Sequence, residues 1–413
     1  MFYLIGKSLA HSYSAEIHRA FGRYDYALQN LPPEAVGDFL KHGEWEGLNV
    51  TIPYKQTVLP FLDEISEEAK SIGSVNTIVR SGDRLVGHNT DYLGFFAMAY
   101  RAGILFGGRK VVILGSGGTC LTASAVARDC GAREIVVISR TGETTYDTLP
   151  RHYDAEILIN TTPVGMYPSN GASAISLTPF QRLVGVIDVI YNPLETPILR
   201  EARLRGIAST GGLYMLVAQA AVAAGHFCGD KPEKAEIDAV YKSILQQKAN
   251  IVLLGMPGVG KSTVARALAA KTGREILDTD QMIETRAGMA IPEIFKTVGE
   301  AKFRDLECEA IAEAGKQSGK IIATGGGAVL REENLNPLTQ NGRLYFLLRP
   351  LDTLARDNRP LSQNADLAQM YQTRLPLYLK FSDATVENKD PDTCADEILE
   401  EFCENIGYKR SKP

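Results

Sequence analysis

The chain has 413 residues, which is enough for two or three domains. Its hydrophobic content of 45% and charged content of 23% are typical of globular proteins, and its formal net charge of −5 argues against a broad basic surface for nucleic acid. The six cysteines are scattered and include no CxxC pair, which favours reduced thiols and a cytoplasmic location. No run of eighteen apolar residues occurs, so we expect no membrane span.

Strands and helices alternate along the whole sequence, which predicts an α/β fold. In the first hundred residues we expect strands at Phe2–Ile5, Leu48–Ile52 and Thr77–Val79, and a helix at Ser66–Ile72. Continuous β-branched runs follow, and such runs are typical of buried parallel strands. They predict further strands at Lys110–Leu114, Glu134–Ile138, Ile157–Ile159 and Val184–Asp188.

Two helices and a strand are expected around the middle of the chain. An apolar, alanine-rich segment from Met215 to about Gly225 predicts the first helix. The charged and periodic segment Lys231–Gln247 predicts a surface helix that begins at Pro232. A strand at Asn250–Leu254 follows with almost no linker, so we expect a tight domain boundary near Lys248.

The stretch Ile251–Leu268, IVLLGMPGVGKSTVARAL, has the pattern of a P-loop: an apolar strand, a glycine-rich turn, then the start of a helix. In such a loop backbone amides hold the phosphates of a nucleoside triphosphate, Lys261 reaches the β and γ oxygens, and the Ser262 hydroxyl ligates Mg²⁺. A P-loop usually begins a domain, so the residues before it belong to something else. The residues expected to bind ATP are Gly258, Val259, Gly260, Lys261, Ser262 and Thr263.

A second nucleotide signature precedes the P-loop. The turn LGSGGT, Leu114–Thr119, follows a predicted strand, and its glycines would let the backbone approach a pyrophosphate at a helix N-terminus. After the next strand comes Ser139-Arg140-Thr141, where a site for NAD usually has an acid. A guanidinium and two hydroxyls suit a 2′-phosphate, which favours NADP. The alternative is that Arg140 is a solvated surface residue.

Polar segments of the first half supply further candidate groups. Ser12 and Ser14 would lie on the same side of an extended chain and grip a carboxylate, or they would cap a helix that starts at Ala15. Lys55, in the segment NVTIPYK, lies at the rim after a strand, where a lone lysine is often only a solvated charge. Asn76 and Asp91 lie in loop-like polar settings. A lysine held beside an aspartate could pass a proton to a carbonyl oxygen as hydride arrives.

Taken together, these segments closely resemble the shikimate dehydrogenase family. The resemblance runs through the whole first half and also includes NTTPVGM at Asn160–Met166, DVIYNPLET at Asp188–Thr196 and GLYMLVAQA at Gly212–Ala220. The family fold implies two α/β lobes. By this resemblance, residues 1–97 with about 215–247 form the substrate-binding lobe, residues 98–214 form a Rossmann NADP-binding lobe, and a P-loop kinase domain with a parallel sheet occupies residues 248–413.

The resemblance also implies roles for individual residues. Lys55 and Asp91 would be the catalytic pair, Ser12 and Ser14 would bind the substrate carboxylate, and ring hydroxyls would be bound by Thr51, Asn76, Gln219 and Asp91. The remaining positions would hold NADPH or NADP: Gly115, Ser116, Gly117, Gly118 and Thr119 at the pyrophosphate, Ser139, Arg140 and Thr141 at the 2′-phosphate, and Asn160, Thr161, Met166 and Gly212 near the nicotinamide.

Three features of the second half indicate which kind of molecule accepts the phosphoryl group. Asp278 and Asp280 have period-two spacing, so both carboxylates would face one side of a strand end, unless they form an acid cluster at a helix start. Arg304, in a helical segment, needs an anion, either a substrate carboxylate or Glu307 at i+3. The glycines of TGGGA, Thr324–Ala328, follow a predicted strand at Lys320–Ala323 and would let the backbone approach a ring, or simply form a turn.

In their order these features resemble the motifs of shikimate kinase, from Asn250 to about Asp383. The resemblance implies that Asp278 helps Ser262 with Mg²⁺ and that Arg359 is a lid arginine reaching the transferred phosphate. The lid, Arg356-Asp357-Asn358-Arg359, is more compact than is usual in the family. The residues implied to bind shikimate are Asp280, Arg304, Gly326, Gly327 and Arg374.

The two resemblances together imply a bifunctional enzyme of aromatic amino-acid biosynthesis that reduces 3-dehydroshikimate with NADPH and phosphorylates the resulting shikimate with ATP and Mg²⁺. The partners expected are small-molecule substrates and neither nucleic acid nor membrane, with the chain a monomer or a homo-oligomer. Two alternatives stay open: a quinate or shikimate dehydrogenase with an impaired kinase half, and a regulator that senses pathway metabolites.

Overall fold

The computed structural model describes residues 1–354 and 367–407. They form an α/β fold with three sheets, as the alternating sequence pattern predicts. The chain divides into two compact units: the first holds residues 1–166, 172–192 and 198–244, and the second holds residues 167–171, 193–197 and 245–413. The limits given above for the two lobes and for the kinase domain stay predictions.

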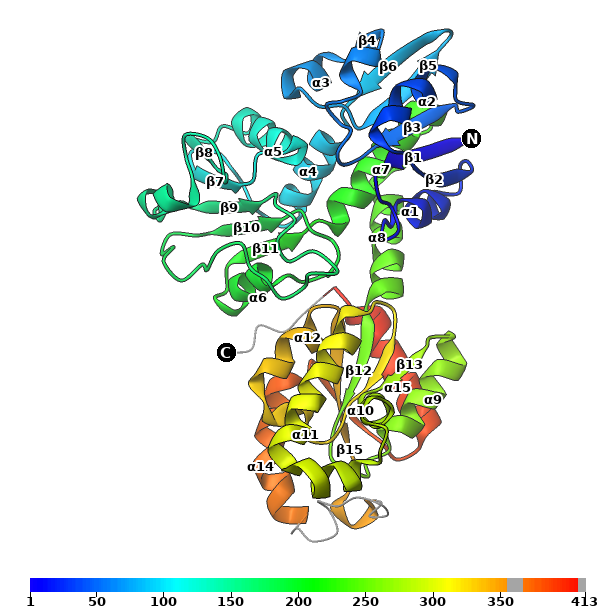
Figure 1. Ribbon diagram of the computed structural model, residues 1–413, viewed down its shortest axis with the longest axis vertical. Helices are drawn as coiled ribbons and strands as arrows, with labels where there is room; N and C mark the ends of the chain where they lie inside the picture. Colours follow the sequence, from blue (N-terminus) through cyan, green and yellow to red (C-terminus); the bar gives the residue numbers. More distant parts are fainter. Residues whose placement is uncertain (355–366, 408–413) are drawn as a thin grey trace. The chain divides into compact units, whose positions relative to one another are not determined.

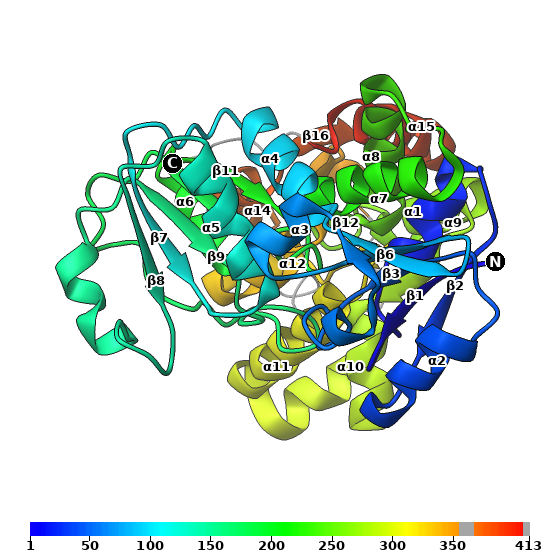
Figure 2. The same ribbon diagram turned by 90° about the horizontal axis from the view of Figure 1, so that it is seen from above.

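The first sheet is mixed and belongs to the first unit, and Figure 2 shows β1, β2, β3 and β6 of this sheet side by side. Its strand order is β2-β1-β3-β5-β6-β4; the neighbouring pairs β3–β5 and β5–β6 are antiparallel, and the remaining pairs are parallel. The strands are β1 (Phe2–Gly6), β2 (Tyr26–Asn30), β3 (Gly47–Val50), β4 (Glu64–Ile65), β5 (Thr77–Ser81) and β6 (Arg84–His88).

The core of this sheet contains Ile5, Leu48 and Ile78, which are fully buried, and the single tryptophan of the chain, Trp45. We expected β3 to extend to Ile52, which is wrong: the strand ends at Val50, and Ile52 is 71% exposed. A proline follows at position 53, and proline cannot donate to a ladder. The helices beside this sheet are α1 (Ser14–Phe21), α2 (Val36–His42) and α3 (Glu67–Ile72).

The second sheet, also in the first unit, is fully parallel with the order β11-β10-β9-β7-β8. In Figure 1, α5 lies on one side of this sheet and α6 on the other. The predicted strand bounds at Lys110–Leu114 and Glu134–Ile138 are confirmed. The strands are β7 (Lys110–Leu114), β8 (Glu134–Ile138), β9 (Ile157–Asn160), β10 (Gly185–Asp188) and β11 (Ala208–Gly211).

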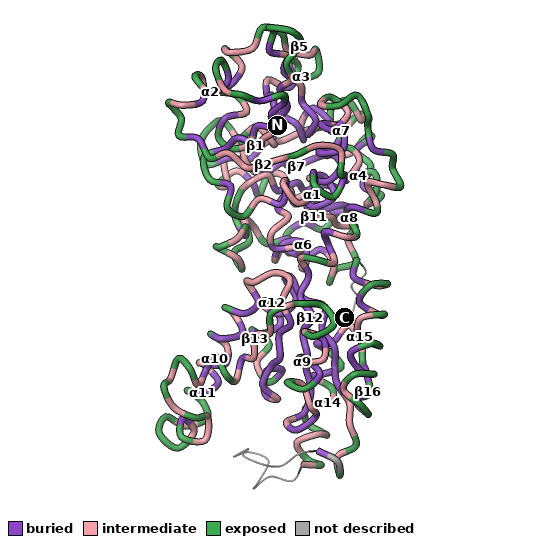
Figure 3. Tube along the Cα trace, turned by 90° about the vertical axis from the view of Figure 1, so that its right-hand side faces the viewer, coloured by how far each residue is buried: buried purple, intermediate pink, exposed green. Residues whose placement is uncertain are grey.

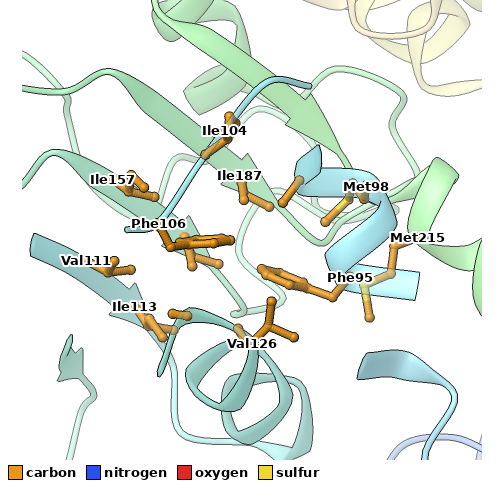
Figure 4. Close-up of a cluster of buried hydrophobic side chains, with 14 of the residues drawn as sticks. Phe95, Met98, Ile104, Phe106, Val111, Ile113, Val126, Ile157, Ile187 and Met215 are labelled. Carbon is orange, nitrogen blue, oxygen red and sulfur yellow. The ribbon is translucent and has the colours of Figure 1, made fainter. Parts of the chain in front are cut away.

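Both faces of the second sheet are covered by apolar side chains, which explains its continuous β-branched strands. On one face, shown in Figure 4, Val111, Ile113 and Ile187 pack with Phe95 and Met215. On the other face the buried residues include Leu114, Phe180 and Leu199. The helices of this part are α4 (Asp91–Arg101), α5 (Gly118–Asp129), α6 (Pro197–Leu204), α7 (Leu213–Cys228) and α8 (Lys234–Lys248).

The third sheet belongs to the second unit and is also parallel, in the order β13-β14-β12-β15-β16. Its central strand β12 (Asn250–Leu254) has the predicted bounds and is buried throughout (Figure 3). The other strands are β13 (Ile276–Asp278), β14 (Ile321–Ala323), β15 (Gly342–Leu348) and β16 (Ala384–Glu387).

Helices pack against the third sheet and against each other, with α9 contacting α15 and α10 contacting α11. Gly299, with φ of +79°, interrupts α11 by a kink. In the described residues no helix is long and apolar enough to cross a membrane. The helices of this unit are α9 (Lys261–Thr272), α10 (Thr279–Ala287), α11 (Ile291–Lys316), α12 (Leu335–Thr339), α14 (Leu367–Phe381) and α15 (Pro391–Asn405).

Candidate active sites

Two serine hydroxyls meet where α1 begins. The Oγ atoms of Ser12 and Ser14 are 3.1 Å apart, and the backbone N–H of Ser14 donates to Ser12 Oγ at 3.3 Å. The expected extended chain is wrong, because Tyr13 between them has helical dihedral angles (φ −87°, ψ 0°) and is itself the residue that precedes the helix. A turn therefore brings the two hydroxyls together.

Tyr191 joins this pair, and the sequence interpretation missed it. Its ring packs against Tyr13 with centroids 5.1 Å apart, and its hydroxyl lies close enough to Ser12 for that side chain to act on its pKa. Burial raises the pKa of Tyr191, and the nearby Ser12 hydroxyl opposes that shift. Three hydroxyls thus converge, which suits a carboxylate ligand. The tyrosine lies in the DVIYNPLET segment, so the segment itself was the available signal.

Lys55 and Asp91 form an ion pair. The Nζ atom of Lys55 donates to Oδ2 of Asp91 at 2.6 Å, and the two side chains are only 14% and 8% exposed. Lys55 lies in the turn after β3, and Asp91 is the first residue of α4. The structure therefore brings together the two groups that the sequence assigns to proton transfer.

A buried polar network lies between β5, α4 and α7. The amide of Asn76 donates to Thr90 Oγ1 at 3.0 Å and to Gln219 Oε1 at 3.3 Å, and Thr90 Oγ1 donates to Gln219 Oε1 at 3.1 Å. The backbone N–H of Thr90 donates to Asn76 Oδ1 at 2.7 Å. These contacts hold Asn76 and Gln219 next to the start of α4, close in sequence to Asp91.

Asn49 supports this network from β3 and was not predicted as a site residue. Its side-chain amide donates to the backbone oxygen of Asn76 and to Thr77 Oγ1, and its oxygen accepts from Tyr26 at 2.8 Å. Thr51, two residues further, is partly buried, and its backbone N–H donates to Ile5. Both residues come from the NVTIPYK segment.

The glycine-rich turn joins β7 to α5. Gly115 has φ of +105°, which favours glycine, and Gly117 and Gly118 lead into the helix. A Cβ atom at Gly118 would lie 3.2 Å from Ser74 Oγ and 3.6 Å from Lys55 Cδ. The helix N-terminus that would hold a pyrophosphate thus lies beside the Lys55 side chain. Ser116 lies in the turn, and Thr119 lies in the first turn of α5.

Further predicted cofactor residues surround the carboxyl ends of β7, β9 and β10. Asn160 donates to Asp188 Oδ1 at 3.1 Å, and Thr161 Oγ1 donates to the backbone oxygen of Leu114 at 2.7 Å. Gly212, just before α7, has no room for a Cβ against Val189. Met166 is 43% exposed. These positions meet at the edge where parallel sheets bind dinucleotides.

Ser139, Arg140 and Thr141 follow β8 at the same edge of the sheet. The Ser139 hydroxyl donates to the backbone oxygen of Thr141, so it closes the loop. Arg140 and Thr141 are exposed. Within residues 1–354 and 367–407, Arg140 forms no ion pair. The guanidinium is therefore available to an anion such as a 2′-phosphate.

The second unit carries the P-loop between β12 and α9. Gly255, Gly258 and Gly260 all have positive φ, at +147°, +86° and +96°, so the loop needs glycine at these positions. Lys261 begins α9, and its Nζ donates to the backbone oxygens of Gly255 and Met256 at 2.8 and 3.1 Å. The lysine thus folds back over the loop that would hold phosphates.

Ser262 and Asp278, the predicted magnesium ligands, are in contact. Ser262 Oγ donates to Asp278 Oδ2 at 2.9 Å. The expectation that Asp278 and Asp280 share one side of a strand is wrong: Asp278 ends β13 and accepts from the backbone N–H of Asp280, which already belongs to α10. Aspartate is a favoured N-cap residue, so Asp278 caps α10 and the two carboxylates do not lie along one strand.

The predicted shikimate residues of the second unit cluster around the TGGGA segment. A Cβ at Gly325 would lie 2.6 Å from Asp280 Oδ1 and 2.7 Å from Glu307 Oε1, and a Cβ at Gly327 would collide with the Arg304 guanidinium. Arg304 pairs with Glu307 at 2.7 Å, as the alternative interpretation proposed. Burial lowers the pKa of Arg304, but Glu307 and Glu300 outweigh burial, so the net direction is upward.

Gly326 connects this cluster to α14 and to the P-loop. Its backbone oxygen accepts from Arg374 Nη1 at 3.0 Å and from the Tyr378 hydroxyl at 2.5 Å. A Cβ at Gly326 would lie 2.6 Å from Cδ of Pro257 in the P-loop. Tyr378 and Glu307 were not predicted as site residues. Arg359 and the rest of the predicted lid, Arg356–Arg359, lie outside the described residues.

In the described residues no cluster of three or more histidine, cysteine or acidic side chains could hold a metal ion. The Ser262–Asp278 pair is nevertheless suited to Mg²⁺. This ion keeps several waters and usually takes one or two protein oxygens together with substrate phosphates.

Comparison with known families agrees with both sites. Residues 4–78 match the family model described as shikimate dehydrogenase substrate binding domain, and residues 257–406 match the model of shikimate kinase. Among relatives, the shikimate dehydrogenase (NADP(+)) of Clostridium perfringens strain SM101 is 36% identical over 265 residues, which cover 59% of this chain and 98% of that protein. The enzyme of the same name from Halothermothrix orenii is 38% identical, over 56% of this chain and 91% of its own.

A solved structure of shikimate 5-dehydrogenase from Thermus thermophilus, in complex with NADP(H) and shikimate, is also similar. It is 30% identical, has a TM-score of 0.53, and the match covers 59% of this chain and 98% of that one. The chain therefore belongs to the shikimate dehydrogenase family through its N-terminal part and carries a shikimate kinase domain in its C-terminal part, which makes it a protein of the shikimate pathway.

Proposed function

We propose that the first unit reduces 3-dehydroshikimate to shikimate with NADPH and that the kinase domain phosphorylates shikimate with ATP and Mg²⁺. The observation that carries the proposal is the Lys55–Asp91 ion pair beside Gly118, where α5 begins. Proton-transfer chemistry and a dinucleotide-binding helix terminus thus lie side by side. The six cysteines are all free, which supports the cytoplasmic location we propose.

Different residues of the dehydrogenase site would bind different groups of the substrate. Ser12, Ser14 and Tyr191 would bind its carboxylate, while Thr51, Asn76 and Gln219 would bind ring hydroxyls. NADPH, when bound, supplies the hydride that reaches the carbonyl carbon. Lys55 gives a proton to the carbonyl oxygen, so that the carbonyl becomes a hydroxyl, and Asp91 holds the ammonium group in the required direction.

The cofactor would lie along the carboxyl edge of the second sheet. The α5 terminus at Gly117 and Gly118 would hold the pyrophosphate, and Arg140 would bind the 2′-phosphate of NADP. The exposure of Arg140 and its lack of an ion pair within the described residues support this assignment. Asn160, Thr161, Met166 and Gly212 would line the nicotinamide side.

In the kinase domain the P-loop residues Gly258–Thr263 would hold the phosphates of ATP. Ser262 and Asp278 would hold Mg²⁺, which supplies neutralisation of phosphate charge when bound. Lys261 would leave the backbone oxygens of Gly255 and Met256 and reach the β and γ oxygens. Arg359 would act as the lid arginine.

Shikimate would bind beside the TGGGA segment. Arg304 and Arg374 are buried cations that would hold its carboxylate, and Asp280 would accept a hydrogen bond from the hydroxyl that attacks the γ phosphorus. Because Gly326 and Gly327 lack side chains, the backbone lies directly against Pro257 and the Arg304 guanidinium, and we place the ring next to this segment. The hydroxyl made in the first reaction is the one phosphorylated in the second, so the two activities are chemically consecutive.

The proposal is tested by assaying each half of the purified chain alone. Shikimate with NADP⁺ should yield NADPH, and shikimate with ATP and Mg²⁺ should yield ADP and shikimate 3-phosphate. NADPH formation without ADP would favour the alternative of an impaired kinase half. Binding of shikimate without either turnover would favour the metabolite-sensing alternative.

A further inference from the structure

Asn388 reaches from the end of the third sheet to the P-loop. It directly follows β16, is 1% exposed, and its backbone N–H donates to the oxygen of Leu348 at the end of β15 at 2.7 Å. Its side-chain Nδ2 donates to the backbone oxygen of Val259 at 2.6 Å. A residue 129 positions further along the chain thus holds one peptide group of the phosphate-binding loop.

The contact fixes the direction of a backbone amide. In a trans peptide the C=O of one residue and the N–H of the next point in opposite directions. Because Asn388 holds the oxygen of Val259, the N–H of Gly260 points to the opposite side of the loop. Gly260 immediately precedes α9, and amides at such a helix start are the groups that bind phosphate.

Because Gly260 has no side chain, the Asn388 amide can reach the oxygen of Val259. Because glycine is flexible, the peptide group needs this hydrogen bond to stay in one orientation. A Cβ atom at this position would lie 2.6 Å from Asn388 Nδ2, so a side chain there would displace the amide. With φ of +96°, Gly260 uses a conformation open to glycine, and glycine has little preference of its own. An outside hydrogen bond is what keeps this peptide group in one orientation.

The side-chain oxygen of Asn388 indicates that the residue matters for its Nδ2 hydrogen bond and not for its packing. Oδ1 is buried and has no hydrogen-bond partner among the residues that the structure describes. Such an unpartnered oxygen disfavours the folded state, so an apolar residue would serve packing better. The feature that only the amide supplies is the hydrogen bond to Val259.

We propose that Asn388 is a positioning residue for nucleotide binding, which orients the Gly260 amide toward the phosphates through the oxygen of Val259. The inference rests on the proposed kinase function. It predicts an effect on ATP binding and not on shikimate binding, because the Asn388 side chain donates to the P-loop and, in the described residues, forms no hydrogen bond with Asp280, Arg304 or Arg374.

The test uses the full chain with two variants, Asn388→Leu and Asn388→Ala. Leucine is close to asparagine in shape, removes the donor, and also removes the unpartnered oxygen. Asn388→Leu exchanges one unpartnered oxygen, Oδ1, for another, that of Val259, so we expect the melting temperature to change little. Binding of a non-hydrolysable ATP analogue with Mg²⁺ should nevertheless weaken by about tenfold, the loss expected for one hydrogen bond. Asn388→Ala should weaken binding similarly, and the KM for shikimate should stay within about twofold in both.

Glu387→Gln is the matched control, because Glu387 is the exposed neighbour on β16 and pairs only with Lys389 at the surface among the described residues. Its nucleotide affinity should equal that of the unmodified chain. Unchanged affinity in Asn388→Leu would overturn the positioning role, and so would an equal loss of ATP and shikimate binding. Failure of the unmodified chain to bind the analogue would instead overturn the proposed kinase function.

Discussion

The ammonium group of Lys55 lies 2.6 Å from Oδ2 of Asp91, and the two residues come from different elements, the turn after β3 and the start of α4. Each side chain is largely buried, so the pair is shielded from solvent. A Cβ at Gly118 would lie 3.6 Å from Lys55 Cδ. This arrangement places a proton donor beside the helix terminus proposed to bind the cofactor, and it is the main support for the proposed reduction.

Lys55→Ala should lower the turnover of 3-dehydroshikimate by about 10²–10⁴-fold, the usual contribution of a positioned acid or base. Phosphorylation of added shikimate should stay unchanged, because the substitution lies outside the kinase domain. The measurement is NADPH oxidation and ADP release in parallel assays. Lys70→Ala is the control, since Lys70 is an exposed lysine paired with Glu67 on α3. Loss of both activities in Lys55→Ala would contradict independent halves.

Arg140→Ala should weaken NADPH far more than NADH, by about 10–100-fold, because a hydrogen bond to a charged group is worth about 1.5–3 kcal/mol. NADH lacks the 2′-phosphate and should lose little. Comparison of KM for the two cofactors checks the prediction. Arg133→Ala serves as control, because Arg133 lies just before β8, at the opposite end of that strand, and pairs with Glu156. An equal effect on both cofactors would exclude the 2′-phosphate assignment.

Ser262→Ala should raise the Mg²⁺ concentration needed for half-maximal kinase rate by about tenfold or more, since it removes one of two predicted metal-holding oxygens. Ser262→Thr keeps the hydroxyl and should retain most of the activity. The dehydrogenase assay on the same samples reports that the chain is intact. If Ser262→Ala showed the same Mg²⁺ dependence as the unmodified chain, the metal would have to be held elsewhere.

His18 should make the first unit sensitive to acid. Burial lowers its pKa to about 3, while the nearby side chain of Asn49 opposes the shift. In the unfolded chain the value is about 6.5. Between these values the unfolded state binds the extra proton, so the free energy of unfolding is highest above about pH 6.5. It then falls by up to about 1.4 kcal/mol per pH unit as the pH drops toward about 3.

Urea unfolding at several pH values checks this prediction. Trp45 is the only tryptophan of the chain and lies in the core of the first sheet, so its fluorescence follows the unit that contains His18. His18 Nδ1 is 2.7 Å from the Tyr24 hydroxyl, and its ring stacks on Tyr26. His18→Gln keeps a polar side chain and removes the titration, so its stability should depend less on pH. An unchanged slope would assign the acid sensitivity to other groups.

The sequence predicted the structure best where a local pattern of residues is compatible with only one local conformation. Continuous apolar runs rich in β-branched residues indicated the bounds of β7 and β12, which are buried throughout, and also those of β8, an edge strand that is only partly buried. The P-loop was equally clear, since few other loops need glycines at these spacings directly before a lysine such as Lys261 at a helix start. Asp278 was harder, because the same residue ends a strand and caps a helix, and only the surrounding fold selects capping.

Some site residues whose partners lie far along the chain were missed. Tyr191 meets Ser12 and Tyr378 meets Gly326, and an aromatic residue in an apolar segment equally indicates a core position. Asn388 is similar, since nothing beside it in sequence points to Val259. Resemblance to known families identified the segments, whereas the partners of each side chain required the fold.

The most direct test of the two-reaction account is a single assay of the unmodified chain with 3-dehydroshikimate, NADPH, ATP and Mg²⁺, in which NADP⁺, ADP and shikimate 3-phosphate are measured together. The account predicts that all three form, with one NADP⁺ and one ADP per shikimate 3-phosphate once shikimate has reached its steady level. NADPH oxidation with accumulation of shikimate and no ADP would contradict it.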